Sequence, residues 1–223
     1  MRVAIWGPEA SGRAGGVCRV RLVFVLRKGV VVRSGIWGPL LLIVPLLALG
    51  IAIGAPRPAS AAQNCPGFVE GETIKGSLVV PTGVSCELYD VDVRGDISIA
   101  PGGSLQLVNS GVRGSVTGAD ITFVEILRTE VRGSIDVQGA TLGATFVFSE
   151  VRGDLNYSGV AGEGAYLQDS TIRRSVTLND NAMIYVIRVA VRGDLSCWGN
   201  GSVGADSGGS TVRGQRLGDC QNL

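Results

Sequence analysis

The sequence predicts an all-β protein whose main domain is a single parallel β-solenoid, because one short phrase recurs at a nearly constant interval and nothing repeats at a helical period. The phrase is a β-branched residue, a basic residue, usually glycine, then a small, polar or acidic residue and an apolar one. It occurs eight times, at spacings of 19, 19, 19, 20, 21, 19 and 21 residues. Such regularity indicates about eight stacked coils, each burying its apolar face only against its neighbours.

Apolar residues occupy fixed columns relative to the first residue of the phrase. That first column contains Ile74, Val93, Val112, Val131, Val151, Ile172, Val191 and Val212. Five residues earlier stand Leu88, Leu107, Ile126, Phe146, Leu167 and Val186, and seven earlier stand Cys86, Leu105, Val124, Ala144, Ala165 and Ile184. Two residues earlier stand Val91, Ser110, Thr129, Ser149, Ser170 and Val189. Alternation of this kind predicts two or three short strands per coil with one face buried, and parallel crossovers favour a right-handed coil.

An export signal is predicted before the repeats. Residues 38–55 form an apolar run that follows several basic residues, and Ala59-Ser60-Ala61 has the A-x-A pattern of a cleavage site. This layout predicts a signal region over residues 1–61, with a start that is extended upstream, and a solenoid domain over residues 62–223. The alternative is an uncleaved segment that anchors the solenoid to the outer face of the membrane. Either arrangement places the solenoid outside the cytoplasm.

Composition limits the chemistry of the solenoid. The chain has no histidine, which excludes an imidazole base or metal ligand. Residues 62–223 contain 12 basic and 18 acidic residues, a net charge of −6 that disfavours nucleic acid and anionic lipid as partners. Neither a calcium-binding nonapeptide nor a cysteine-rich metal motif is found, so we expect no metal, no cofactor and no membrane association once the signal is removed.

Four cysteines remain after residue 61, an even number that suggests disulfides in an exported protein. Cys86 falls in an inward column of the first coil and Cys197 in an inward column of the sixth, on the order of 25 Å away along the stack. Because a disulfide needs its Cα atoms within about 7 Å, we predict the pairs Cys65–Cys86 and Cys197–Cys220.

The basic residues of the phrases are expected to point outward as a ladder: Lys75, Arg94, Arg113, Arg132, Arg152, Arg173, Arg192 and Arg213. Compensation is predicted from acids two positions earlier (Asp92, Glu130 and Glu150) and two positions later (Asp96, Asp154 and Asp194). A charge-balanced, solvated ladder is the simplest interpretation. The functional hypothesis is an anion-binding stripe for acidic glycans that uses Arg113, Arg132 and Arg152.

Glu130 and Glu150 occupy one outward column of successive coils, so their carboxylates are expected about 5 Å apart, the separation found in retaining glycosidases. If the protein is an enzyme, these are the catalytic residues. Against this, the coils are close to minimal length and leave no loops to wall a cleft. The neighbouring arginines also favour two ionised carboxylates, the opposite of what a general acid needs.

The glycine after each basic residue is predicted to mark a bulge or corner whose conformation is costly for other residues, with Arg174 as the exception. At the end of the chain, Arg216 replaces an apolar residue, and Ala205 and Ser207 are small. These changes predict a capped, monomeric solenoid that does not polymerise.

The phrases beginning at Ile74 and Thr211, together with Val79–Cys86, Leu195–Cys197 and Gly218–Cys220, resemble a group of secreted actinobacterial β-helix proteins to which no activity is assigned. The short coil is also similar to that of bactofilins, which are polymer-forming bacterial β-helices. The first resemblance implies a secreted β-helix and no specific task.

We therefore expect an exported, non-enzymatic structural or interaction protein of the cell envelope or medium, with cell-wall or extracellular polysaccharide as its expected partner. The alternatives are a polysaccharide lyase or glycoside hydrolase, which long loops on one face would favour, and a self-assembling filament, which open solenoid ends would favour.

Overall fold

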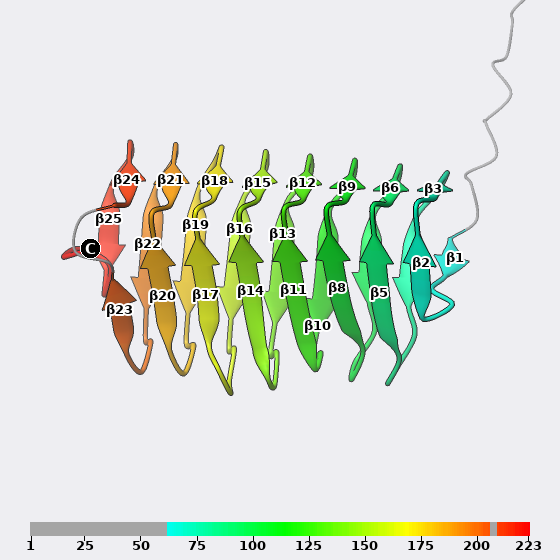
Figure 1. Cartoon of the computed structure of the whole chain (residues 1–223). Coiled ribbons are helices and arrows are strands. Elements are labelled where there is room, and N and C mark those ends of the chain that lie inside the picture. The colour runs from blue at the N-terminus through cyan, green and yellow to red at the C-terminus, as the bar shows by residue number, and fades with distance from the viewer. Residues whose placement is uncertain (1–61, 206–208) are drawn as a thin grey trace, which may run out of the picture. The chain divides into compact units, whose positions relative to one another are not determined.

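The computed structural model describes residues 62–205 and 209–223, which fold into a parallel β-solenoid (Figure 1). The predicted signal region and Ser207 lie outside the described residues. The described part of the chain contains no helix, and hence none that is long and apolar enough to cross a membrane.

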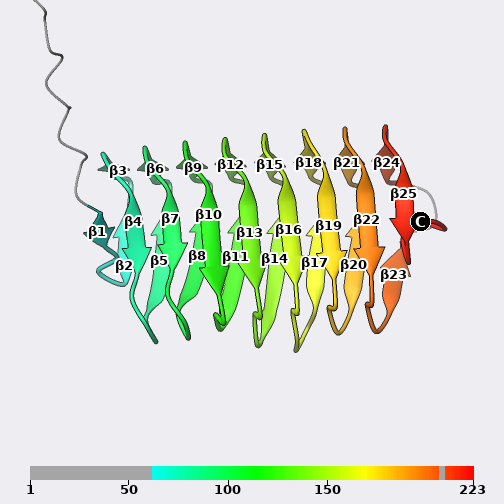
Figure 2. The same ribbon diagram turned by 180° about the vertical axis from the view of Figure 1, so that it is seen from behind.

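Three parallel sheets run along the solenoid axis. Sheet A contains β1 (Gln63–Asn64), β4 (Leu78–Val80), β7 (Ile97–Ile99), β10 (Val116–Ala119), β13 (Ile135–Gln138), β16 (Leu155–Ser158), β19 (Val176–Asn179), β22 (Leu195–Trp198) and β25 (Arg216–Gly218). Sheet B contains β2 (Phe68–Glu70), β5 (Ser85–Tyr89), β8 (Ser104–Val108), β11 (Phe123–Leu127), β14 (Gly143–Val147), β17 (Ala165–Gln168), β20 (Ile184–Ile187) and β23 (Val203–Ala205). Sheet C contains β3 (Thr73–Ile74), β6 (Asp92–Val93), β9 (Gly111–Val112), β12 (Glu130–Val131), β15 (Glu150–Val151), β18 (Thr171–Ile172), β21 (Ala190–Val191) and β24 (Thr211–Val212). Sheet B faces the viewer in Figure 1 and sheet A in Figure 2.

The register of the strands confirms the predicted repeat. In sheet C, Val131 lies opposite Val112 on one side and Val151 on the other. In sheet B, Ile126 lies between Leu107 and Phe146. Each strand thus pairs with the equivalent strand of the adjacent coil, which is the arrangement that spacings of 19 to 21 residues require.

The core lies between the three sheets and consists of the predicted columns. The columns five and seven residues before the phrase are buried in every coil from Cys86 to Val186. The column two residues before it is also buried although it contains hydroxyl residues, with Ser110 7% and Thr129 2% exposed.

Hydroxyl groups are buried at this corner because they satisfy its backbone. A left-handed residue precedes each member of the column, at Asp90, Asn109, Arg128, Phe148, Asp169 and Arg188, with φ between 47° and 55°. Ser110 Oγ accepts the N–H of Val91 at 3.1 Å and donates to the C=O of Val108 at 2.8 Å. Thr129 and Ser149 repeat the pattern, so inward hydroxyls pair backbone groups that the turn leaves without a sheet partner.

The glycine after each basic residue is required for a different reason from the one predicted. None of the glycines at this position has a positive φ. A Cβ on Gly133 would instead lie 2.6 Å from the carbonyl carbon and oxygen of Gly114 and 2.4 Å from Ser115 Oγ. The coils approach so closely here that a side chain has no room, and the sequence could not distinguish this from a strained turn.

Both predicted disulfides are present, one at each end of the solenoid. Cys65 pairs with Cys86 at a Cα–Cα distance of 6.0 Å, and Cys197 pairs with Cys220 at 5.4 Å. At the C-terminal end, Arg216 lies opposite Leu195 and donates to the C=O of Ser210 at 3.1 Å, while Leu223 packs against the core. Arg216, the last residue of the final phrase, and Leu223, which follows it, thus both contact the C-terminal end of the stack.

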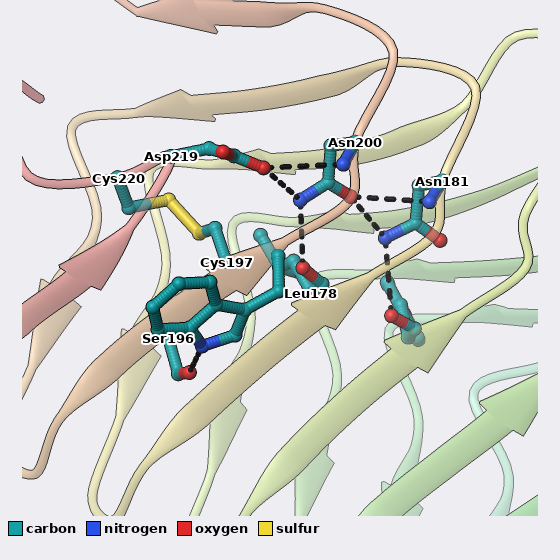
Figure 3. The surroundings of a disulfide bond; sticks show 9 residues. Leu178, Asn181, Ser196, Cys197, Asn200, Asp219 and Cys220 are labelled. Atoms are coloured by element: carbon teal, nitrogen blue, oxygen red, sulfur yellow. Dashed lines mark hydrogen bonds between the residues drawn. A yellow bond between two sulfur atoms is a disulfide. The ribbon is translucent and has the colours of Figure 1, made fainter.

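A ladder of polar side chains accompanies the C-terminal disulfide (Figure 3). Asn181 and Asn200 continue a column that is apolar in earlier coils, where it contains Ile121, Ala140 and Val160. Asp219 follows Gly218, the register partner of Cys197, and its side chain extends the ladder. Asn181 is 1% exposed; it accepts from the N–H of Val160 and donates to the oxygen of Asn200 and to the C=O of Tyr157. Asp219 accepts from both the backbone and the side chain of Asn200.

Candidate ligand-binding surfaces

The eight basic residues of the phrases form one exposed edge beside sheet C, which we call the arginine edge. It consists of Lys75, Arg94, Arg113, Arg132, Arg152, Arg173, Arg192 and Arg213. Each follows the inward residue that ends a two-residue strand of sheet C. Because side chains alternate along a strand, the basic side chain points outward. The predicted ladder is therefore present.

The predicted compensation by acids two positions earlier is also confirmed, and it crosses from coil to coil. Arg113 Nη2 lies 3.1 Å from Asp92, and Arg152 Nη2 lies 2.6 Å from Glu130. Arg173 Nε likewise lies 2.5 Å from Glu150. Each arginine thus contacts the acid of the preceding coil, which places a carboxylate between successive guanidinium groups.

The acids two positions later act differently from the prediction. Asp96 Oδ1 accepts the N–H of Ser115 at 2.8 Å, and Asp154 Oδ1 accepts that of Ser175 at 3.0 Å. Asp194 does the same for Gln215 at 2.8 Å. In the intervening coils a serine hydroxyl accepts the equivalent backbone hydrogen bond. The side chain at this position is therefore a hydrogen-bond acceptor for the backbone of the next coil. Among the described residues, Asp96, Asp154 and Asp194 form no ion pair.

The three arginines that the sequence analysis selected are all ion-paired, since Arg132 also lies 3.4 Å from Glu130. Within the described residues, Lys75, Arg192 and Arg213 form no ion pair. The reason can be seen in the sequence, because the residues two positions earlier are Thr73, Ala190 and Thr211. The cations with the least competition for an anion are thus Lys75 of the first phrase and Arg192 and Arg213 of the last two, and none of the three was selected from the sequence.

Glu130 and Glu150 are register partners in β12 and β15, as predicted. Their side chains are 39% and 35% exposed, and both are held in ion pairs with arginines of the next coil. Both carboxylates of the pair are therefore partly exposed to water.

Two other titratable groups are perturbed. Burial raises the pKa of Tyr157, whose hydroxyl lies in the core with no hydrogen-bond partner among the described residues. The Arg188 guanidinium and the Gln168 amide lower the pKa of Asp169, which Arg188 contacts at 2.6 and 2.7 Å. No group of three or more His, Cys, Asp or Glu side chains within residues 62–205 and 209–223 is placed to hold a metal ion.

Two shallow hollows interrupt the flat faces. One of about 280 Å³ lies on sheet A and is lined by Ser98, Ile99, Thr117, Gly118, Ala119, Asp136 and Gln138. The other, of about 420 Å³, lies at the corner between sheets A and B and is lined by Phe123, Leu142, Gly162 and Glu163. Neither hollow was predicted from the sequence, although the second coincides with two of the three repeat intervals that are longer than 19 residues.

Comparison of the chain with models of protein families, with curated proteins and with solved structures found no match.

Proposed function

We propose that this protein is an exported, non-enzymatic interaction protein that binds acidic polysaccharide along its arginine edge. The observation that carries the proposal is the column of outward basic residues, spaced by one coil each over the length of the solenoid. A planar guanidinium group can engage a sugar carboxylate through two hydrogen bonds. An extended anionic chain that lies along this edge would therefore meet one basic side chain per coil.

Export is supported by two independent features. Residues 1–61 have the layout of a signal region, and the two disulfides close loops at the ends of the solenoid. Structural disulfides of this kind persist in oxidising compartments.

Affinity along the edge is expected to be uneven. Asp92, Glu130 and Glu150 compete with a ligand for Arg113, Arg132, Arg152 and Arg173, whereas no acid competes for Arg192 and Arg213. We therefore assign first contact to Arg192 and Arg213, with Arg113, Arg132 and Arg152 exchanging protein carboxylates for those of the ligand. Such binding is weak and sensitive to salt, because all of these side chains are exposed.

The test is binding of uronic-acid polymers and of neutral polysaccharides to the purified protein, measured at low and physiological salt. Wild type is compared with Arg192→Ala/Arg213→Ala and with Arg113→Ala/Arg132→Ala. We expect binding of the acidic polymers alone, a larger loss in the first double variant and a smaller loss in the second. Equal binding by wild type and both variants would remove the arginine edge from the proposal.

The same preparations serve to test the rival class. We expect no release of reducing ends from any polymer in the panel, since Glu130 and Glu150 lie ion-paired on an open edge. Release that is abolished by Glu130→Gln or Glu150→Gln would establish a glycosidase or lyase instead.

A further inference from the structure

Three repeat intervals are longer than 19 residues, and in two adjacent ones the extra residues fall at one corner. Between β10 and the inward Val124 of β11 lie four residues. The equivalent turn before Ala144 has five residues, and the turn before Ala165 has six. The turn before Ile184 has four again. In a repeat protein, insertions that gather on one face often mark a binding surface.

These longer turns lie at the lower edge of Figure 1, before β14 and β17, and they build the hollow of about 420 Å³. Its lining is Phe123, Leu142, Gly162 and Glu163. Leu142 is 57% exposed, one of four large apolar side chains among the described residues that are exposed to this degree. The volume lies in the range of small-molecule sites, which is about 300–1,000 Å³.

Gly143 lies beside two residues of the lining. A Cβ at this position would be in van der Waals contact with Gly164 O at 3.4 Å, Glu163 Cβ at 3.5 Å and Phe123 Cε2 at 3.9 Å. Its φ of 154° is a conformation that residues with side chains rarely adopt.

The turns are held in place by backbone hydrogen bonds. The N–H of Leu142 donates to the C=O of Thr122, and the N–H of Glu163 donates to the C=O of Leu142, both at 2.9 Å. The N–H of Gly164 closes its own turn on the C=O of Ala161 at 2.9 Å. The hollow is therefore preformed, which reduces the conformational entropy lost when a ligand binds.

The chemistry of the lining favours a cation. It combines an aromatic ring and an aliphatic side chain with one exposed carboxylate, Glu163, and it contains no basic residue. An ammonium group is attracted both by a carboxylate and by an aromatic ring, whereas uronates and phosphates are repelled by the carboxylate. We propose that this corner binds an organic ammonium group carried on a small body with apolar surface, such as an amino sugar. This site is separate from the arginine edge, and its ligand has the opposite charge.

The experiment uses titration of the purified protein with tetramethylammonium and with glucosamine, followed by NMR, with N-acetylglucosamine and glucuronate as controls. We expect saturable shifts for both ammonium probes, with a dissociation constant on the order of millimolar. We also expect no saturation with glucuronate and clearly weaker binding of N-acetylglucosamine. If N-acetylglucosamine binds as tightly as glucosamine, the site recognises neutral sugars and the proposal is wrong.

Matched variants locate the site. Glu163→Gln should weaken glucosamine binding about fivefold or more, and Leu142→Ala should weaken both ammonium probes. Glu72→Gln, an exposed acid in the first coil, should leave binding unchanged. All three residues are exposed, so we expect little effect on folding, which a thermal melt verifies. Unchanged binding in Glu163→Gln, or no saturation by either ammonium probe, would overturn the proposal whatever the arginine edge binds.

Discussion

Arg152 contacts Glu130 of the preceding coil at 2.6 Å, while Glu150, two residues before Arg152 in the sequence, contacts Arg173 of the following coil at 2.5 Å. The arginine edge is thus a chain of contacts between coils, in which acids occupy the intervals between guanidinium groups. This arrangement limits the repulsion of stacked arginines and, for the same reason, limits their availability to an external anion.

Removing one of these acids should lower the stability of the protein slightly and strengthen its binding of acidic polymers. In Glu130→Gln, Arg132 and Arg152 lose their carboxylate partner. Because the groups are 39–50% exposed, the loss of unfolding free energy should be less than about 1 kcal/mol. Binding of uronic-acid polymers should become stronger, and more so at low salt. Urea unfolding and polymer titration measure the two effects, with Glu72→Gln as the control; weaker binding would contradict the competition proposed above.

The close approach of the coils at Gly133 predicts a steric penalty even for alanine. The added Cβ meets the backbone of Gly114, which cannot move without disturbing the adjacent sheet, so Gly133→Ala should cost about 1–3 kcal/mol. Phe146→Ala, which removes a fully buried ring, should cost more, about 3–5 kcal/mol. Urea melts compare the two. A Gly133→Ala protein as stable as wild type would show that the coils separate easily here.

The C-terminal disulfide should stabilise its own end of the stack. Cys197 and Cys220 are separated by 23 residues, and a loop of that size corresponds to about 3 kcal/mol. Since each coil contacts only its neighbours, Cys197→Ser/Cys220→Ser should increase hydrogen exchange in β22 and β25 and leave β8 and β11 protected. The variant Cys65→Ser/Cys86→Ser provides the mirror control. Loss of protection along the whole solenoid would mean that the end cap governs global unfolding. In light scattering, the oxidised wild type should remain monomeric.

Asp169 should contribute to stability in a pH-dependent way. Hydrogen bonds from Arg188 and Gln168 hold its pKa below its ordinary value of 3.8. A carboxyl whose pKa is lowered by folding stabilises the folded state above the unfolded pKa, and this contribution is lost as pH falls through the folded pKa. Asp169→Asn should therefore be less stable than wild type at pH 7, and the two should converge toward pH 2. Urea midpoints measured across this range test it; a constant difference would assign the effect to packing.

The sequence predicted the parts of this molecule that depend on periodicity. Val112, Val131 and Val151 recur at fixed intervals, which determines which residues stack and which face inward, and the cysteine pairs follow from that register. The repeat does not determine which atom of the next coil a polar side chain contacts. Whether Asp96 pairs with an arginine or with the N–H of Ser115 depends on a difference of a few ångströms. The spacing revealed that three intervals are longer than 19 residues, but only the register of β14 and β17 located the extra residues of two of them at one corner.

The polar ladder at the C-terminal corner provides the sharpest test of hydrogen-bond satisfaction in the core. Asn181 is 1% exposed and uses both sides of its amide. Its nitrogen donates to Tyr157 C=O at 3.1 Å and to Asn200 Oδ1 at 3.0 Å (Figure 3). Its oxygen accepts from Val160 N–H at 2.9 Å. Asn181→Val restores the apolar character of earlier coils but leaves these groups unpaired, at a cost of about 1–3 kcal/mol. Asn181→Asp should cost more at pH 7, because an ionised carboxylate would face two acceptor oxygens in a buried site. Its protonated form can donate one hydrogen bond, so the aspartate variant alone should recover stability as pH falls from 7 to 4. Urea melts of both variants at the two pH values decide between this account and simple loss of packing, in which the valine and aspartate proteins would respond to pH alike.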